Sequence, residues 1–147
     1  MSTSGCAAEL FGKGYNCAQS VLAASAPDIG LDENTAFKIA TGFGAGLGYR
    51  GEMCGAVIGA YLAIGLKYGL TQPAAEQDKK EKTYRLIGEF LEQFRKRNGS
   101  VYCRDLLQYD TSDPVQLKEA REKNVFDEKC PKFVQDASEI LEKILSV

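Results

Sequence analysis

Apolar side chains recur at steps of three and four residues along two long stretches of the chain. This spacing is typical of helices that bury one face against the rest of a protein. No stretch alternates apolar and polar residues for long enough to predict a strand. We therefore expect an all-α fold, a single-domain bundle of about five to seven helices over residues 1–147. The two stripes are Tyr84, Ile87, Phe90, Leu91 and Phe94, and Phe133, Val134, Ala137, Ile140, Leu141, Ile144 and Leu145.

Capping and helix-breaking residues predict where the individual helices begin and end. Asp32 is a candidate N-cap, with Glu33 in the first turn, for a helix through Ala40. Prolines and glycines set further boundaries. They predict short helices around 7–10 and 17–24, a turn over 27–30, a helix over about 52–68, a long charged helix between 73 and 98, short helices over 101–107 and from 113, and a last helix after Pro131.

A glycine-rich segment, Gly46 to Gly51, satisfies the pattern GxGxxG of dinucleotide-binding loops. That function requires a strand before the loop and an acidic residue about twenty positions after it. Here a helix is expected before the loop, and the acidic residue is missing. The segment is therefore interpreted as a tight connection whose glycines adopt positive φ and allow close backbone approach. Its backbone amides could also donate hydrogen bonds to the sulfurs of a site formed by Cys54.

The helix expected over 52–68 is rich in small residues, including Gly55 and Gly59 one turn apart. A glycine inside a helix costs about 1 kcal/mol relative to alanine, so a close neighbour should compensate. That neighbour is either another helix or a cofactor, and packing is the more common reason. Both interpretations place this helix at the centre of the bundle.

Composition and charge narrow the classes of function. The chain is 44% hydrophobic and 26% charged, as expected of a globular domain. Its net charge of −2 provides no general attraction to nucleic acid or to an anionic membrane. The longest apolar stretch, residues 56–66, is too short to cross a bilayer. Residues 1–14 lack the basic and apolar regions of a secretion signal. We expect a cytoplasmic protein with no nucleic acid or membrane partner.

The cysteines and the absence of histidine limit the chemistry. Without histidine the chain cannot form a Ser-His-Asp triad, a Cys–His nucleophile pair or an HExxH zinc site. The absence of any CxxC pair argues against a zinc ribbon, a thioredoxin-type dithiol and a ferredoxin-type run. Single cysteines from different helices can still converge, as side chains do in the cofactor sites of helical bundles. The five cysteines are Cys6, Cys17, Cys54, Cys103 and Cys130.

The surroundings of two cysteines give weak indications of function. Cys54 lies near the N-terminus of its expected helix, where the helix dipole lowers the pKa of a thiol. Cys130 precedes Pro131, an arrangement also found at the end of bacterial iron–sulfur motifs. Free cysteine is also among the most buried residue types and often packs as a small apolar side chain. The residues alone leave functional and structural roles equally open.

Four segments of the chain resemble the family of redox proteins named for the signature C_GCAxxG_C_C. They are residues 14–21 (GYNCAQSV), residues 42–59, which end in EMCGAVIG, residues 103–107 (CRDLL) and the pair Cys130-Pro131. The resemblance extends from about Ala7 to Leu141. One departure is that this chain reads C-G-A-x-x-G from Cys54 to Gly59, whereas the signature places a glycine before the cysteine.

The resemblance implies a helical protein with a cysteine-based redox role. Related domains imply an iron–sulfur centre held between helices. By position, the family cysteines are Cys17, Cys54, Cys103 and Cys130, whereas Cys6 lies outside the signature. The resemblance names neither a substrate nor a redox partner.

Three functions remain open. In the first, Cys17, Cys54, Cys103 and Cys130 hold a [2Fe–2S] cluster or another thiolate-bound metal, and the protein transfers electrons to a redox partner. In the second, Cys54 is the catalytic thiolate of a thiol–disulfide oxidoreductase, and another of the four resolves the mixed disulfide. In the third, the protein is a non-catalytic helical scaffold with cysteines in its core, and the stripe along 133–144 could also form a homodimer.

Overall fold

The computed structural model describes residues 2–146 and confirms the all-α fold. Within these residues, the only extended pairing is an isolated antiparallel bridge between Met53 and Tyr102. Seven of the α-helical segments contain eight or more residues, in agreement with the expected number. No helix of the described chain is both long enough and apolar enough to span a bilayer. The segments are α1 (Thr3–Gly12), α2 (Cys17–Ile29), α3 (Glu33–Ala40), the 3-10 turn η1 (Thr41–Phe43), α4 (Gly44–Leu47), α5 (Gly55–Tyr68), α6 (Gln77–Asn98), α7 (Cys103–Leu107), α8 (Pro114–Glu122) and α9 (Val125–Leu145).

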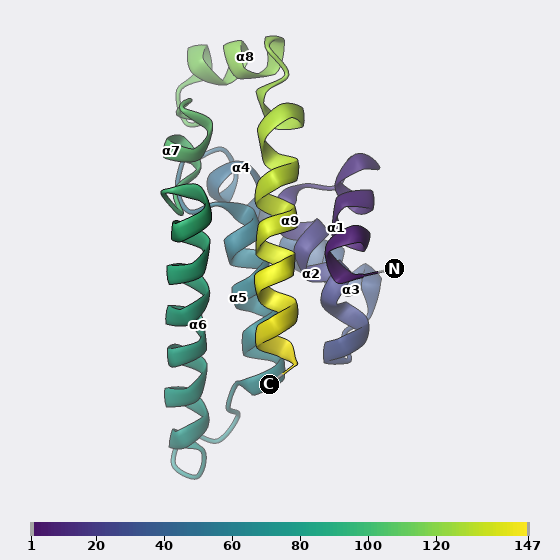
Figure 1. Cartoon of the computed structure of the whole chain (residues 1–147), viewed down its shortest axis with the longest axis vertical. Helices are drawn as coiled ribbons and strands as arrows, with labels where there is room; N and C mark the ends of the chain where they lie inside the picture. Colours follow the sequence, from purple (N-terminus) through teal and green to yellow (C-terminus); the bar gives the residue numbers. More distant parts are fainter. Residues whose placement is uncertain (1, 147) are drawn as a thin grey trace.

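Helix α9 lies at the centre of the bundle, where it packs against α1, α2, α5 and α6. Figure 1 shows α6 and α9 side by side along the long axis, with α1, α2 and α3 on the other side of α9. The short segments α4, α7 and α8 gather at one end, near the beginning of α9 (Figure 1). We call this end, formed by residues 41–54 and 101–124, the irregular end.

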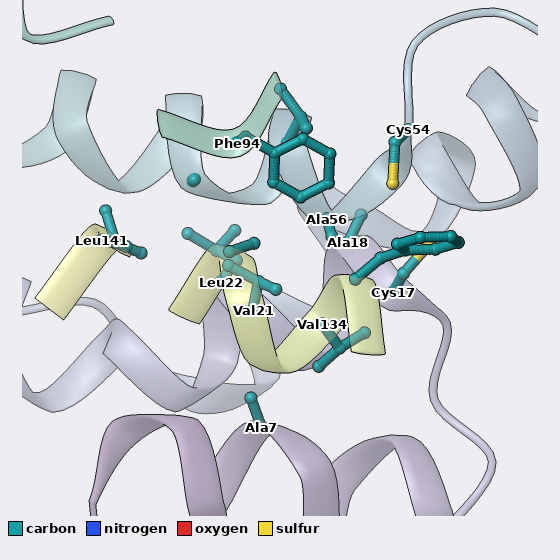
Figure 2. Packing of buried hydrophobic residues seen from close by; sticks show 14 of the residues in the cluster. Ala7, Cys17, Ala18, Val21, Leu22, Cys54, Ala56, Phe94, Val134 and Leu141 are labelled. Atoms are coloured by element: carbon teal, nitrogen blue, oxygen red, sulfur yellow. The ribbon is translucent and has the colours of Figure 1, made fainter. Parts of the chain in front are cut away.

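The two apolar stripes predicted from the sequence form the core. Phe90 and Phe94 of α6 are completely buried, as are Val134 and Leu141 of α9. Figure 2 shows Phe94, Val134 and Leu141 pointing into one cluster with residues of α2 and α5. Tyr84, the first residue of the α6 stripe, is 63% exposed and lies outside this core. The α9 stripe is thus covered by other helices of the same chain.

Helices α2 and α5 approach each other closely at a glycine. A Cβ atom at Gly59 would lie 2.8 Å from the Ala18 carbonyl oxygen and 3.2 Å from the Val21 Cβ, too close for any larger residue. The packing interpretation of this helical glycine is therefore confirmed. The contact also fixes the N-terminal ends of α2 and α5 relative to each other, and each of these ends carries a cysteine.

Two of the predicted helix starts are confirmed by their capping bonds. The side chains of Asp32 and Asp113 accept hydrogen bonds from the backbone N–H groups of Thr35 and Val115, respectively. The turn predicted from Pro27 comes later than expected, because α2 continues through this proline and ends at Ile29.

The prediction that the last helix starts after Pro131 is wrong. Helix α9 begins at Val125 and contains Pro131 in its second turn. A proline inside a helix removes one backbone hydrogen bond and costs about 3 kcal/mol or more. Helix α9 spans 21 residues and packs against four long helices, so its buried apolar face outweighs this local cost.

Candidate functional site at the irregular end

All four signature cysteines line one cavity of about 310 Å³ at the irregular end. They come from four parts of the chain: Cys17 is the first residue of α2, Cys54 directly precedes α5, Cys103 is the first residue of α7, and Cys130 lies in α9. Each is at most 7% exposed. Cys6, on α1, is not among the residues that line the cavity. The structure thus brings together the residues that the resemblance grouped and leaves out the one that it excluded.

Cys17 and Cys54 are in direct contact within this cluster, since their thiols are hydrogen-bonded to each other. Figure 2 shows them at one edge of the core, with the two sulfurs facing the same space. A Cβ atom at Gly55 would lie 2.7 Å from the Cys17 sulfur and 2.6 Å from the Phe43 carbonyl oxygen. Glycine at position 55 is therefore required for the approach of Cys17 to α5.

The start of α2 is held by a capping box next to Cys17. The Asn16 side chain accepts a hydrogen bond from the Gln19 N–H at 2.8 Å, and the Gln19 side chain accepts one from the Asn16 N–H at 3.0 Å. The Asn16 amide also donates to the Thr41 carbonyl at 3.0 Å. Asn16 therefore fixes both the helix end that carries Cys17 and the chain that enters the glycine-rich segment.

A short backbone pairing brings Cys54 next to Cys103. The Cys54 N–H donates to the Val101 carbonyl at 2.8 Å, and the Cys103 N–H donates to the Glu52 carbonyl at 2.7 Å. Because of this pairing, α5 starts at Gly55 and not at residue 52 as the sequence suggested. Residues far apart in sequence are thus joined beside the cavity.

The glycine-rich segment adopts left-handed backbone conformations over five consecutive residues. The φ angles of Ala45, Gly46, Leu47, Gly48 and Tyr49 are all positive. The helix α3 and the turn η1 precede the segment, as expected, so it is not a dinucleotide-binding loop and the tight connection is confirmed. The left-handed region costs a residue with a side chain roughly 1–2 kcal/mol, and three of the five carry one. Other contacts must therefore hold this segment in place.

Cys17 has the lowest pKa of the four thiols. The hydrogen bond from the Cys54 thiol is the largest of the effects that lower the pKa of Cys17 to about 7, while burial opposes them. The backbone N–H groups of Ala45, Ala18 and Cys17 itself also donate to the Cys17 sulfur and favour its thiolate form. The bond between a backbone amide near the glycine-rich segment and a cysteine sulfur therefore comes from Ala45, just before that segment, and reaches Cys17, whereas it was expected from the segment itself at a site formed by Cys54.

The pKa values of the other three thiols are raised. Cys54 donates its hydrogen bond to Cys17 and is buried beside it, and both effects raise the pKa of Cys54 well above its ordinary value. Burial, with smaller contributions from the charges of Cys17 and Asp110, raises the pKa of Cys103 to about 12. Burial also raises the pKa of Cys130. The helix dipole was expected to make Cys54 the low-pKa thiol, but in the folded chain Cys17 has that property.

Several residues around the cavity were not identified from the sequence. Tyr49 and Arg121 line it, and the Arg121 guanidinium lies 5.1 Å from the centre of the Tyr49 ring. Thr111 is 2% exposed and bonds both ends of residues 45–51, which we call the left-handed segment. It donates to the Ala45 carbonyl at 2.8 Å and accepts from the Gly51 N–H at 2.9 Å. No local pattern marks these residues, because their partners lie sixty or more positions away in the chain.

The sequence model of the family described as "Putative redox-active protein (C_GCAxxG_C_C)" matches residues 15–144. The chain belongs to this family. The match confirms the resemblance and includes all four cysteines of the cavity but not Cys6. The description of the C_GCAxxG_C_C family refers to redox activity and names neither a cofactor nor a partner. No curated protein and no solved structure matches the chain.

Proposed function

We propose that the protein transfers electrons and that Cys17, Cys54, Cys103 and Cys130 hold an iron–sulfur centre, with [2Fe–2S] the first choice. The observation that carries this proposal is that four signature cysteines from four separate parts of the chain line a single cavity of about 310 Å³. Four thiolates and no histidine are the donor set of such a cluster.

The cysteines are not grouped as they would be around a single metal ion. In a tetrahedral site around a single zinc ion, each sulfur lies about 2.3 Å from the metal, so that the four sulfurs lie within about 4 Å of one another. Within residues 2–146, no three cysteine or carboxylate side chains are grouped closely enough to surround one ion. The hydrogen-bonded pair Cys17–Cys54 could hold one end of a larger centre, with Cys103 and Cys130 at the other.

The surroundings of the sulfurs also fit such a centre. A coordinating thiol is deprotonated by the metal, so the raised pKa values of Cys54 and Cys103 make binding release protons. When bound, an iron–sulfur cluster takes up and releases single electrons. The Ala45 N–H that donates to the Cys17 sulfur would stabilise the additional negative charge of the reduced form, and burial of all four cysteines keeps water from them.

The test is to purify the protein without oxygen and to measure iron, acid-labile sulfide and the visible spectrum. We expect about two irons and two sulfides per chain or per dimer. Substitution of serine for Cys17, Cys54, Cys103 or Cys130 should remove them, and Cys6→Ser, the matched control outside the cavity, should not. Zinc alone would indicate a structural site, and loss of iron in Cys6→Ser would contradict the assignment of ligands.

A thiol–disulfide oxidoreductase is the second candidate, and the hydrogen bond between the Cys17 and Cys54 thiols favours it. The Cys17 thiolate would attack a substrate disulfide, forming a mixed disulfide and releasing one thiolate, which takes up a proton. Cys54, after losing its proton, would then attack the Cys17 sulfur, giving the Cys17–Cys54 disulfide and releasing the second substrate thiol. This assigns the attack to Cys17, whose thiolate accepts backbone hydrogen bonds, and the resolving role to Cys54.

Metal-free, colourless protein that forms a Cys17–Cys54 disulfide with glutathione disulfide would favour this second candidate. Metal-free protein that retains its stability with all four cysteines replaced by alanine would favour the non-catalytic scaffold instead. In both redox candidates, the cytoplasm is the proposed location, since it keeps the thiols reduced, and a further redox protein is the proposed partner.

A further inference from the structure

Thr111 connects the left-handed segment to the loop between α7 and α8. It lies between α7 and α8 and is almost completely buried, at 2% exposure. Its hydroxyl donates to the Ala45 carbonyl at 2.8 Å and accepts from the Gly51 N–H at 2.9 Å. A single side chain therefore satisfies a backbone acceptor at the start of the segment and a backbone donor at its end.

The segment requires such a contact because its own hydrogen bonds are local. The N–H groups of Gly48, Arg50 and Glu52 all donate to nearby carbonyls, those of Gly44 and Gly46. These bonds form the turn but do not orient it relative to Cys17. The position of the whole turn is set by contacts from other elements.

Other contacts to this segment from the same side are more exposed than that of Thr111. The Arg104 guanidinium donates to the Gly51 carbonyl at 3.3 Å, and the Arg104 side chain is 48% exposed, so water competes for this bond. The Asp110 carboxylate accepts from the N–H and hydroxyl of Ser112, at 2.9 Å and 2.6 Å, and thereby holds the loop that carries Thr111. Of Thr111, Arg104 and Asp110, Thr111 alone is buried.

We propose that Thr111 is a positioning residue for Cys17: by fixing the Ala45 carbonyl and the Gly51 amide, it directs the Ala45 N–H onto the Cys17 sulfur. The Ala45 N–H and carbonyl belong to adjacent peptide planes that meet at one α-carbon. The turn closed by the bond from the Gly48 N–H to the Gly44 carbonyl at 2.8 Å holds the dihedral angles of Ala45 between these planes, so fixing the carbonyl also restricts the direction of the N–H. The inference rests on the proposed function in one respect, because it takes negative charge on the Cys17 sulfur to be part of that function.

The test compares Thr111→Val with Thr111→Ser. Valine has nearly the shape of threonine but can neither donate nor accept a hydrogen bond, whereas serine keeps the hydroxyl. In the metal-free, reduced protein, the amide exchange rate of Ala45 should rise at least about tenfold in Thr111→Val and stay near the wild-type rate in Thr111→Ser. This readout requires neither iron nor a redox reaction, so it can succeed or fail independently of the proposed function.

A second readout tests the consequence for the site. If the protein holds an iron–sulfur centre, the reduction potential should become more negative in Thr111→Val and recover in Thr111→Ser, because an amide bond to sulfur stabilises the reduced form. Thr83→Val is the matched control, since the Thr83 hydroxyl donates to the Lys79 carbonyl at 2.8 Å on α6. It should change neither readout.

Equal amide exchange at Ala45 in wild type, Thr111→Val and Thr111→Ser would overturn the proposal. So would a rise in Thr111→Val that Thr111→Ser shares, because the hydroxyl would then not be the cause. If Thr111→Val does not fold, Thr111→Ala removes the same hydroxyl without adding a methyl group in its place. Faster exchange at Ala45 and Gly51 in the folded Thr111→Ala protein supports the proposal, and unchanged exchange contradicts it.

Discussion

The helical middle of the molecule and its irregular end are built by different kinds of interaction. In the middle, α2, α5, α6 and α9 pack through apolar stripes, and residues such as Phe90 and Ile140 are completely buried. At the irregular end, backbone groups of residues 45–54 are held by specific hydrogen bonds to residues 101–111, and the segment contains costly left-handed residues. The cysteine cavity lies at this second end.

This difference separates the part of the molecule that provides stability from the part that positions the cysteines. Apolar packing is cooperative and non-directional, so the middle provides stability without defining any single atom. Hydrogen bonds at the irregular end are directional and define the positions of the cysteine sulfurs. We therefore expect substitutions in the middle to change stability, and substitutions at the irregular end to change the chemistry of the cysteines.

The largest effect on stability is expected for Phe90→Ala. Phe90 is completely buried, and its ring centre lies 6.5 Å from that of Tyr61 and 6.1 Å from that of Phe94. Its removal should lower the free energy of unfolding by about 3–5 kcal/mol, measured by chemical denaturation of the metal-free, reduced protein. Val115→Ala, at a residue that is 75% exposed, should change it by less than about 0.5 kcal/mol. A changed alkylation rate of Cys17 in folded Phe90→Ala would contradict the expectation that substitutions in the helical middle leave the chemistry of the cysteines unchanged.

A smaller effect on stability but a larger one on chemistry is expected for Gly55→Ala. The new methyl group would meet the Cys17 sulfur and the Phe43 carbonyl oxygen at 2.7 and 2.6 Å, so we expect a loss of about 1–3 kcal/mol and a separated Cys17–Cys54 pair. Gly88→Ala is the control, because a Cβ there meets nothing within 4 Å. It should stabilise the protein by up to about 1 kcal/mol. Equal stability of the two variants would show that the cavity wall can relax.

The smallest of these effects concerns the pH dependence of the thiols in the metal-free protein. The pKa of Cys17 is lowered to about 7, so its alkylation by iodoacetamide should rise about tenfold per pH unit below 7 and level off above it. Cys103, with its pKa raised to about 12, should react slowly throughout this range. Peptide mapping by mass spectrometry separates the two sites.

The lowered pKa of Cys17 also makes the stability of the folded protein depend on pH. A lowered pKa in the folded state means that the Cys17 thiolate contributes stability above the ordinary thiol pKa of 9.0, and this contribution is lost as the pH falls through about 7. An alkylation rate of Cys17 that is still rising steeply at pH 9 would contradict the role of the Cys54 and backbone hydrogen bonds.

Much of the fold was predictable because its causes are periodic or local. The stripes along α6 and α9 follow from helical spacing, and the caps Asp32 and Asp113 act on residues two or three positions away. The start of α9 was not predictable, because the local signal of Pro131 is outweighed by contacts with α1, α2, α5 and α6. The four cysteines were grouped by their resemblance to a family signature and not by their spacing.

The sequence by itself determined the all-α class, the amphipathic helices and the set of cysteines worth testing, since each depends on residue type and short-range pattern. Only the tertiary structure decided that these four cysteines share a cavity, that Cys17 and not Cys54 has the lowered pKa, and that Thr111 bonds both ends of the left-handed segment. The physical reason is that a pKa and a directional hydrogen bond depend on groups close in space. In this chain those groups are separated by tens of residues in sequence.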